Sequence, residues 1–397
     1  MCINKAIVRD KKILDSLKGD KMLEDNKIEK IDSESDDSYS NDDLYNISSW
    51  GADLSFRELI TMYEEDELQK PELQRKYVWD KVEASRFIDS LLLGLPVPSI
   101  FLANTSDENK LIIDGFQRIM TVYDYVKGVW SKDKKVFKLS NSEKINNKWR
   151  GKAFAELENP EKKRIRSTTI HAIIFEQKSP KEDDTSLYQI FERINTSGRS
   201  LFPQEIRNCV YQGKFNDMLF SLNKNSCWRK LYGLEDEDPR MRDLEYILRF
   251  FALDTDYIKF YEKSSISLKK YLNEFMGSKN SQKDDVIKKR EENFALVIKF
   301  IHQHFGEDAF YNISSKDPEK IRKRFYPTIF DALTVSTSIA IASLDDKIDT
   351  NGLGRKRLAL LQNDDFKKYI TEGTMQTLHI HGRFRVALRE LYGLNYE

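Results

Sequence analysis

The strongest local constraint on the fold lies in Leu111 to Val126, with the sequence LIIDGFQRIMTVYDYV. The run from Leu111 to Ile113 is short, apolar and mostly β-branched, which indicates the end of a buried strand. Gly115 interrupts this pattern. From Ile119 onward the apolar residues recur at helical spacing, so we expect a helix to begin near Gln117. The segment therefore predicts a strand that turns directly into a helix.

The turn between this strand and this helix carries polar residues that suit an anion. The first backbone N–H groups of a helix lack intrahelical acceptors and lie at the positive end of its dipole, which favours phosphate. Arg118 adds a permanently charged fork of donors. Asp114 would repel phosphate unless Mg²⁺ bridges the two or the carboxylate orients an attacking water, and Gln117 is a candidate to hold that water or a base edge. A plain Asp-Gly turn before a solvated helix explains the same residues equally well.

Composition bounds the class of protein. The 397 residues can form two domains and a tail, and the balance of 65 basic and 65 acidic residues excludes a general cationic coat for nucleic acid. Three scattered cysteines and an N-terminus without an apolar core predict a reducing, cytoplasmic setting. The least charged stretch, Leu333 to Leu344, is shorter than the roughly 20 residues that a helix needs to cross a bilayer, so we expect no membrane contact.

The N-terminal residues 1–44 form a lysine- and acid-rich lead, in which Asp32 to Asp43 contains six acidic and no basic residues. This composition predicts a disordered segment. An acidic arm that occupies a basic site when substrate is absent is the alternative, although such charge runs are usually just solvated. Beyond Gly213 the pattern is helical almost throughout. We expect helices over Arg242 to Ala252, Asp284 to Phe305, Pro327 to Ser343 and Met375 to Leu391.

Four segments together resemble one known family. FIDSLLLGLPVPSIFL followed by LIIDGFQRIMTVYDYV resembles the nucleotide-binding core of the ParB/sulfiredoxin-like fold. Within that superfamily it resembles the DGQQR-motif family, typified by the N-terminal domain of GmrSD-type modification-dependent restriction endonucleases. LQRKYVWD resembles the upstream Gln-Arg-x-x-Tyr-x-Trp element of that family, and FERINTSGRSLFPQEIRNCVY its downstream element. The resemblance implies an α+β fold, with a ParB-like nucleotide-binding domain at 45–180 and an all-α helical domain at 181–397.

The resemblance also implies a nucleotide site. Asp114, Gln117 and Arg118 would be its catalytic residues, and Asp114 would contact Mg²⁺ through phosphate. The remaining nucleotide-binding candidates are Gln74, Arg75, Gly115, Phe116, Asn195, Glu205 and Arg207. Phe116 stands where the family has the first glutamine of DGQQR. If that amide contacts nucleotide or water in relatives, hydrolysis is weakened here, or the phenyl ring stacks on a base instead. For Glu205 and Arg207, an internal helix cap and salt bridge is an equally good interpretation.

A basic segment, KWRGKAFAELENPEKKRIR, is the best local candidate for contact with DNA because Trp149 and Phe154 are interleaved with its charges. Its basic residues are Lys148, Arg150, Lys152, Lys162, Lys163, Arg164 and Arg166. A solvated helix face is the more ordinary explanation of such a pattern.

The sequence lacks the motifs of several known types of catalytic and binding site. We find no HNH nuclease signature, and no Walker-type glycine loop, so a nucleotide site would have to be the one at Asp114. His302 and His304 are two residues apart, on opposite sides of a helix, and cannot share a metal ion. The nearest cysteine to the Asp-Gly turn is Cys209, which argues against a sulfiredoxin-like redox enzyme.

Three functional hypotheses follow. The first is an enzyme of DNA defence that binds or hydrolyses a nucleoside triphosphate of unknown base with Mg²⁺, in which cleavage occurs in the ParB-like domain or in a separate nuclease subunit. DNA and a second copy of the chain are its further expected partners. The second is a non-catalytic module that senses nucleotide or DNA and works with a separate nuclease. The third is an interaction scaffold with a vestigial pocket.

Overall fold

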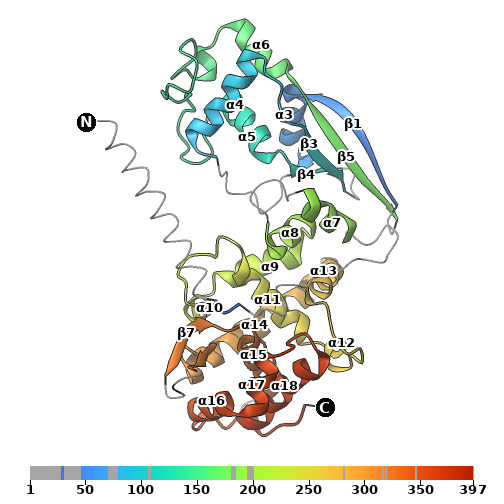
Figure 1. Cartoon of the computed structure of the whole chain (residues 1–397), viewed down its shortest axis with the longest axis vertical. Coiled ribbons are helices and arrows are strands. Elements are labelled where there is room, and N and C mark those ends of the chain that lie inside the picture. Colours follow the sequence, from blue (N-terminus) through green and yellow to red (C-terminus); the bar gives the residue numbers. More distant parts are fainter. Residues whose placement is uncertain are drawn as a thin grey trace, which may run out of the picture. The chain divides into compact units, whose positions relative to one another are not determined.

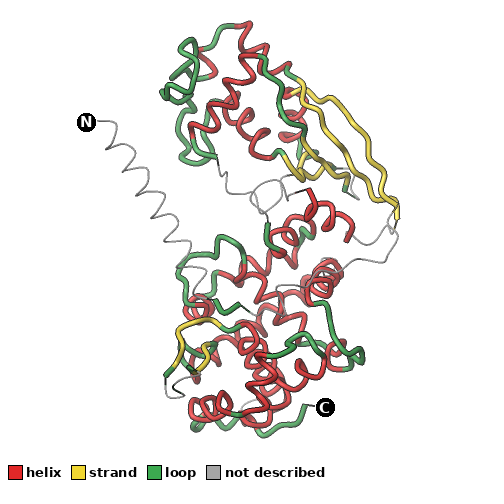
Figure 2. Tube along the Cα trace, in the orientation of Figure 1, coloured by secondary structure: helices red, strands yellow, loops and turns green. Residues whose placement is uncertain are grey.

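The computed structural model describes residues 28–30, 46–69, 79–105, 109–179, 185–194, 201–279, 282–314, 317, 320–344 and 347–396. The chain divides into two compact units, Asn41–Gln212 and the combination of Met1–Ser40 with Gly213–Glu397. The first contains the large sheet and the second is mainly helical (Figures 1 and 2). We call them the sheet unit and the helical unit.

The sheet unit is built on a mixed sheet of five strands in the order β1-β5-β3-β4-β2. The strands are β1 (Asn46–Ser55), β2 (Leu68–Gln69), β3 (Ile100–Asn104), β4 (Lys110–Asp114) and β5 (Thr169–Ser179). β1 and β5 pair antiparallel, β5 and β3 parallel, β3 and β4 antiparallel, and β4 and β2 parallel. Because β4 has a neighbour on each side, the position of its last residue, Asp114, is set by the sheet.

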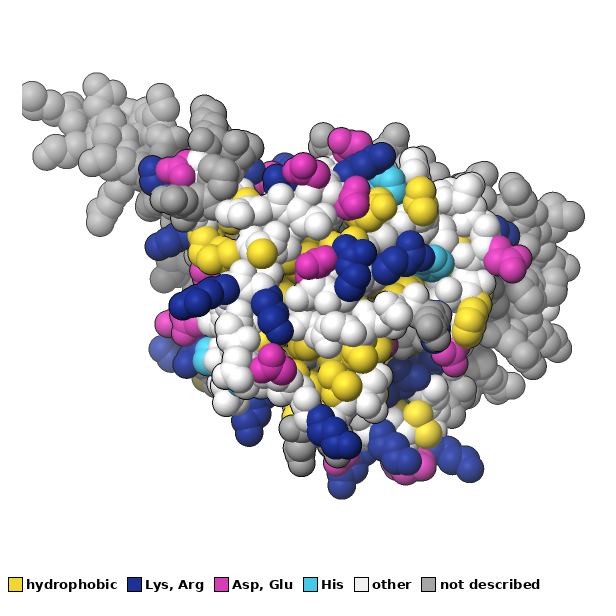
Figure 3. Space-filling view, turned by 90° about the horizontal axis from the view of Figure 1, so that it is seen from below, with side chains coloured by type: hydrophobic (Ala, Val, Ile, Leu, Met, Phe, Trp, Pro, Cys, Tyr) yellow, Lys and Arg dark blue, Asp and Glu magenta, His cyan; other side chains and the backbone are white. Residues whose placement is uncertain are grey.

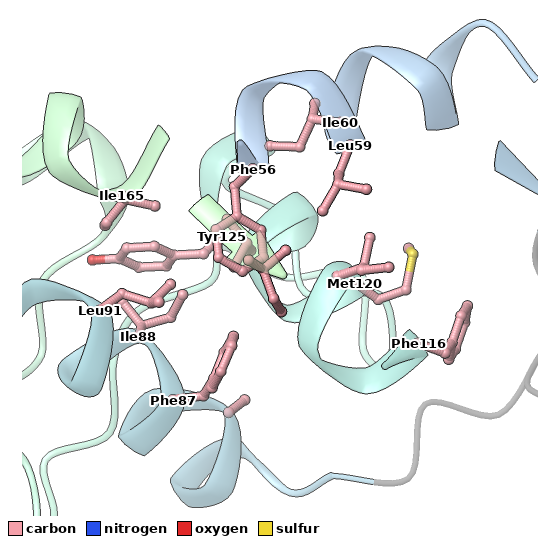
Figure 4. Close-up of a cluster of buried hydrophobic side chains, with 14 of the residues drawn as sticks. Phe56, Leu59, Ile60, Phe87, Ile88, Leu91, Phe116, Met120, Tyr125 and Ile165 are labelled. Carbon is pink, nitrogen blue, oxygen red and sulfur yellow. The ribbon is translucent and has the colours of Figure 1, made fainter. Parts of the chain in front are cut away.

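Helices cover one face of this sheet (Figure 1). They are α3 (Phe56–Glu64), α4 (Lys81–Leu93), α5 (Phe116–Lys127) and α6 (Asn159–Ser167), with a short 3-10 turn η2 (Phe154–Glu156). Their apolar side chains and those of β3, β4 and β5 form one buried cluster, part of which Figure 4 shows. Two more helices, α7 (Thr185–Ile194) and α8 (Pro203–Val210), complete the unit.

Local sequence signals account for the ends of these helices. Ser55 caps α3 and Asp80 caps α4, and the glutamates three residues later, Glu58 and Glu83, accept hydrogen bonds from the backbone N–H groups of the capping residues. Such caps stabilise a helix by about 1 kcal/mol each. Gly94 ends α4 in the left-handed region, at φ 76°, a conformation that glycine adopts without strain.

The helical unit is packed around α15 (Pro327–Leu344), which contacts α11 (Arg242–Leu253), α14 (Asp284–Phe305) and α18 (Thr377–Tyr392). The other helices are α9 (Lys214–Asn223), α10 (Ser226–Tyr232), α12 (Asp256–Lys259), α13 (Leu268–Lys279), α16 (Leu353–Gln362) and α17 (Asp364–Thr371). Among the described residues α15 alone is long and apolar enough to cross a membrane, but most of it is buried within the unit, as in the core helix of a folded domain.

A buried ion-pair network joins three of these helices. Asp331 on α15 accepts hydrogen bonds from Arg249 on α11, at 2.5 Å, and from Arg383 on α18, at 3.1 Å. All three side chains are at most 1% exposed. Charges removed from water in this way are tolerated only when they are paired and hydrogen-bonded, so the network fixes how the helices meet.

The structure confirms an α+β region followed by a helical one, with three differences from the expected organisation. The first unit ends at Gln212, not near residue 180, because α7 and α8 group with the sheet. The helical unit also contains a small hairpin of β6 (Tyr311–Ile313) and β7 (Ile321–Phe325), so it is not purely α.

The third difference concerns the N-terminal lead, in which only residues 28–30 are described. Ile28 forms a parallel bridge with Phe325 of β7, and Glu29 pairs with Arg322 and Arg324 at 3.0 and 3.1 Å. This short piece of the lead is therefore structured against the helical unit.

Candidate functional site

The predicted strand-to-helix turn forms as expected, and Gly115 is the residue that makes it possible. Its φ of 102° lies in the left-handed region, and a Cβ atom at this position would stand 2.2 Å from Cγ2 of Ile100. A side chain here would thus be strained by its backbone and would also clash with β3. The N–H of Ile119 bonds the Gly115 carbonyl at 3.0 Å and closes the first turn of α5. No side chain caps this helix.

Arg118 is held by acceptors of its own domain. Its Nη1 donates to the carbonyl oxygens of Pro98, at 2.8 Å, and Ser99, at 2.6 Å, and its Nη2 donates to the Asp114 carboxylate. The Arg118 side chain is 13% exposed, whereas that of Asp114 is 41% exposed. Arg118 therefore ties the entry of β3 to the end of β4, neutralises Asp114 and leaves part of that carboxylate open.

Gln117 links the turn to the upstream motif. Its Oε1 accepts from the backbone N–H of Trp79 at 3.2 Å, and Lys132 Nζ donates to the Trp79 carbonyl at 2.9 Å. The Trp79 ring packs edge-on against Phe87 of α4, with 5.6 Å between centroids. The last aromatic residue of LQRKYVWD is thus fixed beside the first turn of α5. Gln74 and Arg75 lie outside the described residues.

Phe116 lies in the hydrophobic core. It is only 4% exposed and belongs to the same buried cluster as the helices on the sheet. Figure 4 shows its ring next to Met120, one turn further along α5. In this arrangement the ring does not present an open face on which a base could stack, and it occupies space that an apolar residue fills better than a glutamine.

The second predicted cluster has a local structural role at α8. Glu205 accepts from the backbone N–H of Phe202 at 2.6 Å, as expected of a helix cap. Arg207 Nε donates to Gln204 Oε1 at 2.7 Å, and both Glu205 and Arg207 are buried. The cap that we considered for Glu205 is therefore present. Asn195 lies outside the described residues.

Most of the candidate DNA-binding residues contact their own domain. Lys148 pairs with Glu161 at 2.7 Å, and Arg166 lies over the Phe154 ring. Arg150, Lys162 and Arg164 donate to backbone carbonyl oxygens. Lys152 is half-buried and Lys163 is exposed.

The aromatic residues of this segment are not exposed either. Trp149 and Phe154 are each 6% exposed, and the Trp149 indole N–H donates to Asp89. They form core contacts and not a stacking surface, which favours the structural interpretation of this segment. Burial by itself raises the pKa of Glu161, but hydrogen bonds from Lys148 and the Glu158 N–H outweigh burial and lower it.

Charges of both signs are interspersed on the surface that Figure 3 shows, in keeping with the neutral net charge.

Within the described ranges, no three His, Cys, Asp or Glu side chains gather in a way that could hold a metal ion. Of the described residues at the turn, Asp114 could contact a divalent cation together with groups from a ligand.

One comparison with known proteins gives a match. Residues 56–212 match the family model described as the GmrSD restriction endonuclease, N-terminal domain. The match covers roughly two fifths of the chain, includes the Asp-Gly turn, and ends where the sheet unit ends. No curated protein matches the chain.

Proposed function

Because residues 56–212 match the model of the GmrSD restriction endonuclease N-terminal domain, we propose that the chain acts in restriction-type defence against foreign DNA by binding a nucleoside triphosphate at the β4–α5 turn. The observation that carries the proposal is a partly open carboxylate, Asp114, immediately before a helix N-terminus that no side chain caps. The DNA-defence role follows from the family match, and the ParB-like character of the fold is part of the same proposal.

The geometry of the turn suits a triphosphate. Phosphate oxygens would accept from backbone N–H groups at the start of α5, where the helix dipole is positive. Asp114 does not oppose this binding, because Arg118 compensates its charge. In this scheme Arg118 is a positioning residue, since its three hydrogen bonds orient Asp114 and join it to β3. Gln117 keeps the upstream motif beside the site.

The residues present fit Mg²⁺. This cation usually takes one or two carboxylates together with substrate phosphates, and the open part of Asp114 supplies one such oxygen. When bound, Mg²⁺ would neutralise charge that develops on the phosphates. We further propose that the protein works in the cytoplasm, with DNA and with a nuclease that is a separate subunit or a second copy of this chain.

Phe116 favours a second candidate function, a nucleotide sensor without turnover. Phe116 replaces the first glutamine of the DGQQR motif, so the site lacks one amide. A buried phenyl ring cannot hydrogen-bond to a water molecule in its place. The sensor would bind a triphosphate and pass the signal to a nuclease partner.

The experiment is hydrolysis of each of the four nucleoside triphosphates by the full chain with Mg²⁺, with and without DNA. Asp114→Asn removes the charge that we assign to the site, and Glu143→Gln is the matched control, because Glu143 is an exposed carboxylate elsewhere in the sheet unit. We expect Asp114→Asn to lower turnover by about 100-fold or more, and Glu143→Gln to leave it unchanged. Binding without turnover by the unaltered protein would support the sensor, and absence of both would overturn nucleotide dependence.

A further inference from the structure

A second concave site lies within the helical unit, where the sequence singled out no motif. It is a pocket of about 450 Å³, within the size range of small-ligand sites. The end of α11, the short helix α12, and α14, α15 and the C-terminal residues line it. The residues that matter for its chemistry are Leu253, Asp254, Arg290, Val335, Ile339 and Tyr396.

Arg290 contributes a half-buried guanidinium to the lining of this pocket. Its Nε donates to Gln282 Oε1 at 3.1 Å, and its Cζ lies 6.0 and 5.9 Å from the ring centroids of Phe251 and Phe275. Burial lowers the pKa of Arg290, which reflects its partial loss of water. Among the described residues no carboxylate lies within ion-pair distance of Arg290, but the charge of Asp254 acts on it and partly offsets the effect of burial. The two rings lie against the guanidinium group itself and hold it in place, and the N–H groups at its edge can donate to acceptors on a ligand.

Asp254 supplies a carboxylate to the same pocket, a hydrogen-bond acceptor that complements the donors of Arg290. Its Oδ2 accepts from Ser338 Oγ at 2.6 Å, and Asn293 in turn donates to Ser338 at 3.2 Å. Within the described ranges no residue donates to the other carboxylate oxygen. Burial raises the pKa of Asp254, so the carboxylate lacks much of its hydration. A desolvated carboxylate of this kind gains most from N–H donors supplied by a ligand.

The rest of the pocket suits a flat, partly apolar ligand. Leu253, Val335 and Ile339 provide apolar wall, and the Tyr396 side chain lies beside them.

We propose that this pocket binds a guanine base, either as a free nucleotide or as a base exposed in a single strand. Guanine is the base with two adjacent N–H donors on one edge, N1–H and N2–H, which together fit one carboxylate. Its O6 and N7 atoms are the acceptors that an arginine fork contacts in protein–DNA complexes. Asp254 would bind the first edge and Arg290 the second. The site goes beyond the function proposed for the β4–α5 turn and does not depend on it.

Calorimetry with the full chain tests this assignment. The probes are dGMP, dAMP, dCMP and dTMP, and two single strands of nine thymidines, one of which has guanine at its centre. We expect dGMP, or the strand containing guanine, to bind at least about tenfold tighter than its counterparts. Arg290→Gln should weaken this binding by about tenfold. The matched control is Lys288→Gln, because Lys288 is an exposed cation on the same helix.

Asp254→Asn tests the other half of the site and should also weaken guanine binding. Because Asp254 is hydrogen-bonded within the unit, the melting temperature of this variant is measured beside that of Arg290→Gln, so that loss of structure is distinguished from loss of a ligand contact. Equal affinity for all four bases, or no binding of any probe, would overturn the proposal. So would guanine binding that Asp114→Asn abolishes and Arg290→Gln leaves intact, since the ligand would then occupy the β4–α5 turn.

Discussion

At the scale of single residues, the most informative feature is how Arg118 is used. An arginine beside an Asp-Gly turn suggests a free fork for phosphate, yet this guanidinium contacts two carbonyl oxygens and one carboxylate of its own domain. The partners Pro98 and Ser99 precede it by about twenty residues, so only the folded sheet brings them together. Because of these contacts, Arg118 does not face a ligand directly. Its charge instead compensates that of Asp114, whose carboxylate stays partly exposed, and an anion can bind beside a carboxylate only when the negative charge is compensated in this way.

Gly115 allows a direct test of the turn. Gly115→Ala should destabilise the sheet unit by about 2–4 kcal/mol, because it combines an unfavourable φ with a clash against Ile100. Gly94→Ala is the control, since Gly94 has a similar φ of 76° but open space around it, and it should cost about 1 kcal/mol. Urea unfolding measures both. Equal losses would mean that the approach of β3 does not constrain the turn.

At the scale of elements, the helix ends of the sheet unit are governed by short-range chemistry. Ser55→Ala should destabilise α3 by about 1 kcal/mol at neutral pH, because it removes the side chain that caps the helix. The hydrogen bond from the Ser55 side chain lowers the pKa of Glu58 below its ordinary value of 4.5. A lowered carboxyl pKa contributes stability that is present above the unfolded value and is lost as pH falls through the folded value.

The difference in stability between the unaltered protein and Ser55→Ala should therefore be largest above about pH 5 and shrink in more acidic solution. Chemical unfolding at several pH values measures this difference. A gap that stays constant down to pH 3 would show that the capping box contributes nothing through Glu58.

The helical unit depends on a long-range element contact. Asp331→Ala should cost about 3–5 kcal/mol, because it leaves Arg249 and Arg383 buried without their carboxylate. Asp364→Ala is a suitable control, since that carboxylate is almost fully exposed and pairs with Lys367 at the surface. Thermal unfolding monitored by circular dichroism compares them. A loss of less than about 1 kcal/mol for Asp331→Ala would mean that the helices repack around the two arginines.

These elements also explain what the sequence could predict. Local sequence patterns were sufficient to predict α14, whose predicted and observed bounds agree at Asp284–Phe305. They were also sufficient to predict the turn at Gly115. Caps, glycine stops and helical periodicity act within a few residues, so a sequence displays them. The burial of Phe116 and the assignment of α7 and α8 to the sheet unit depend on partners distant in the chain, which local patterns do not contain. For the same reason the pocket beside Arg290, formed by residues more than 100 positions apart, left no motif.

At the scale of the whole molecule, the chain contains two separate cores, one under the sheet and one around α15. Chains with separate cores commonly unfold in more than one step. We therefore expect calorimetry to resolve two transitions, and the variants above assign them. Gly115→Ala should lower only the melting temperature of the sheet unit, and Asp331→Ala only that of the helical unit.

The same two transitions separate the two proposed ligands. A ligand that binds only the folded state stabilises its unit by RT ln(1 + [L]/Kd), about 2.7 kcal/mol at one hundred times Kd. A nucleoside triphosphate with Mg²⁺ should therefore raise the transition that Gly115→Ala lowers, provided that the Asp114 site binds it. A guanine nucleotide without Mg²⁺ should raise the transition that Asp331→Ala lowers. If both ligands moved the same transition, one of the two sites would be wrongly assigned, and Asp114→Asn and Arg290→Gln would identify which.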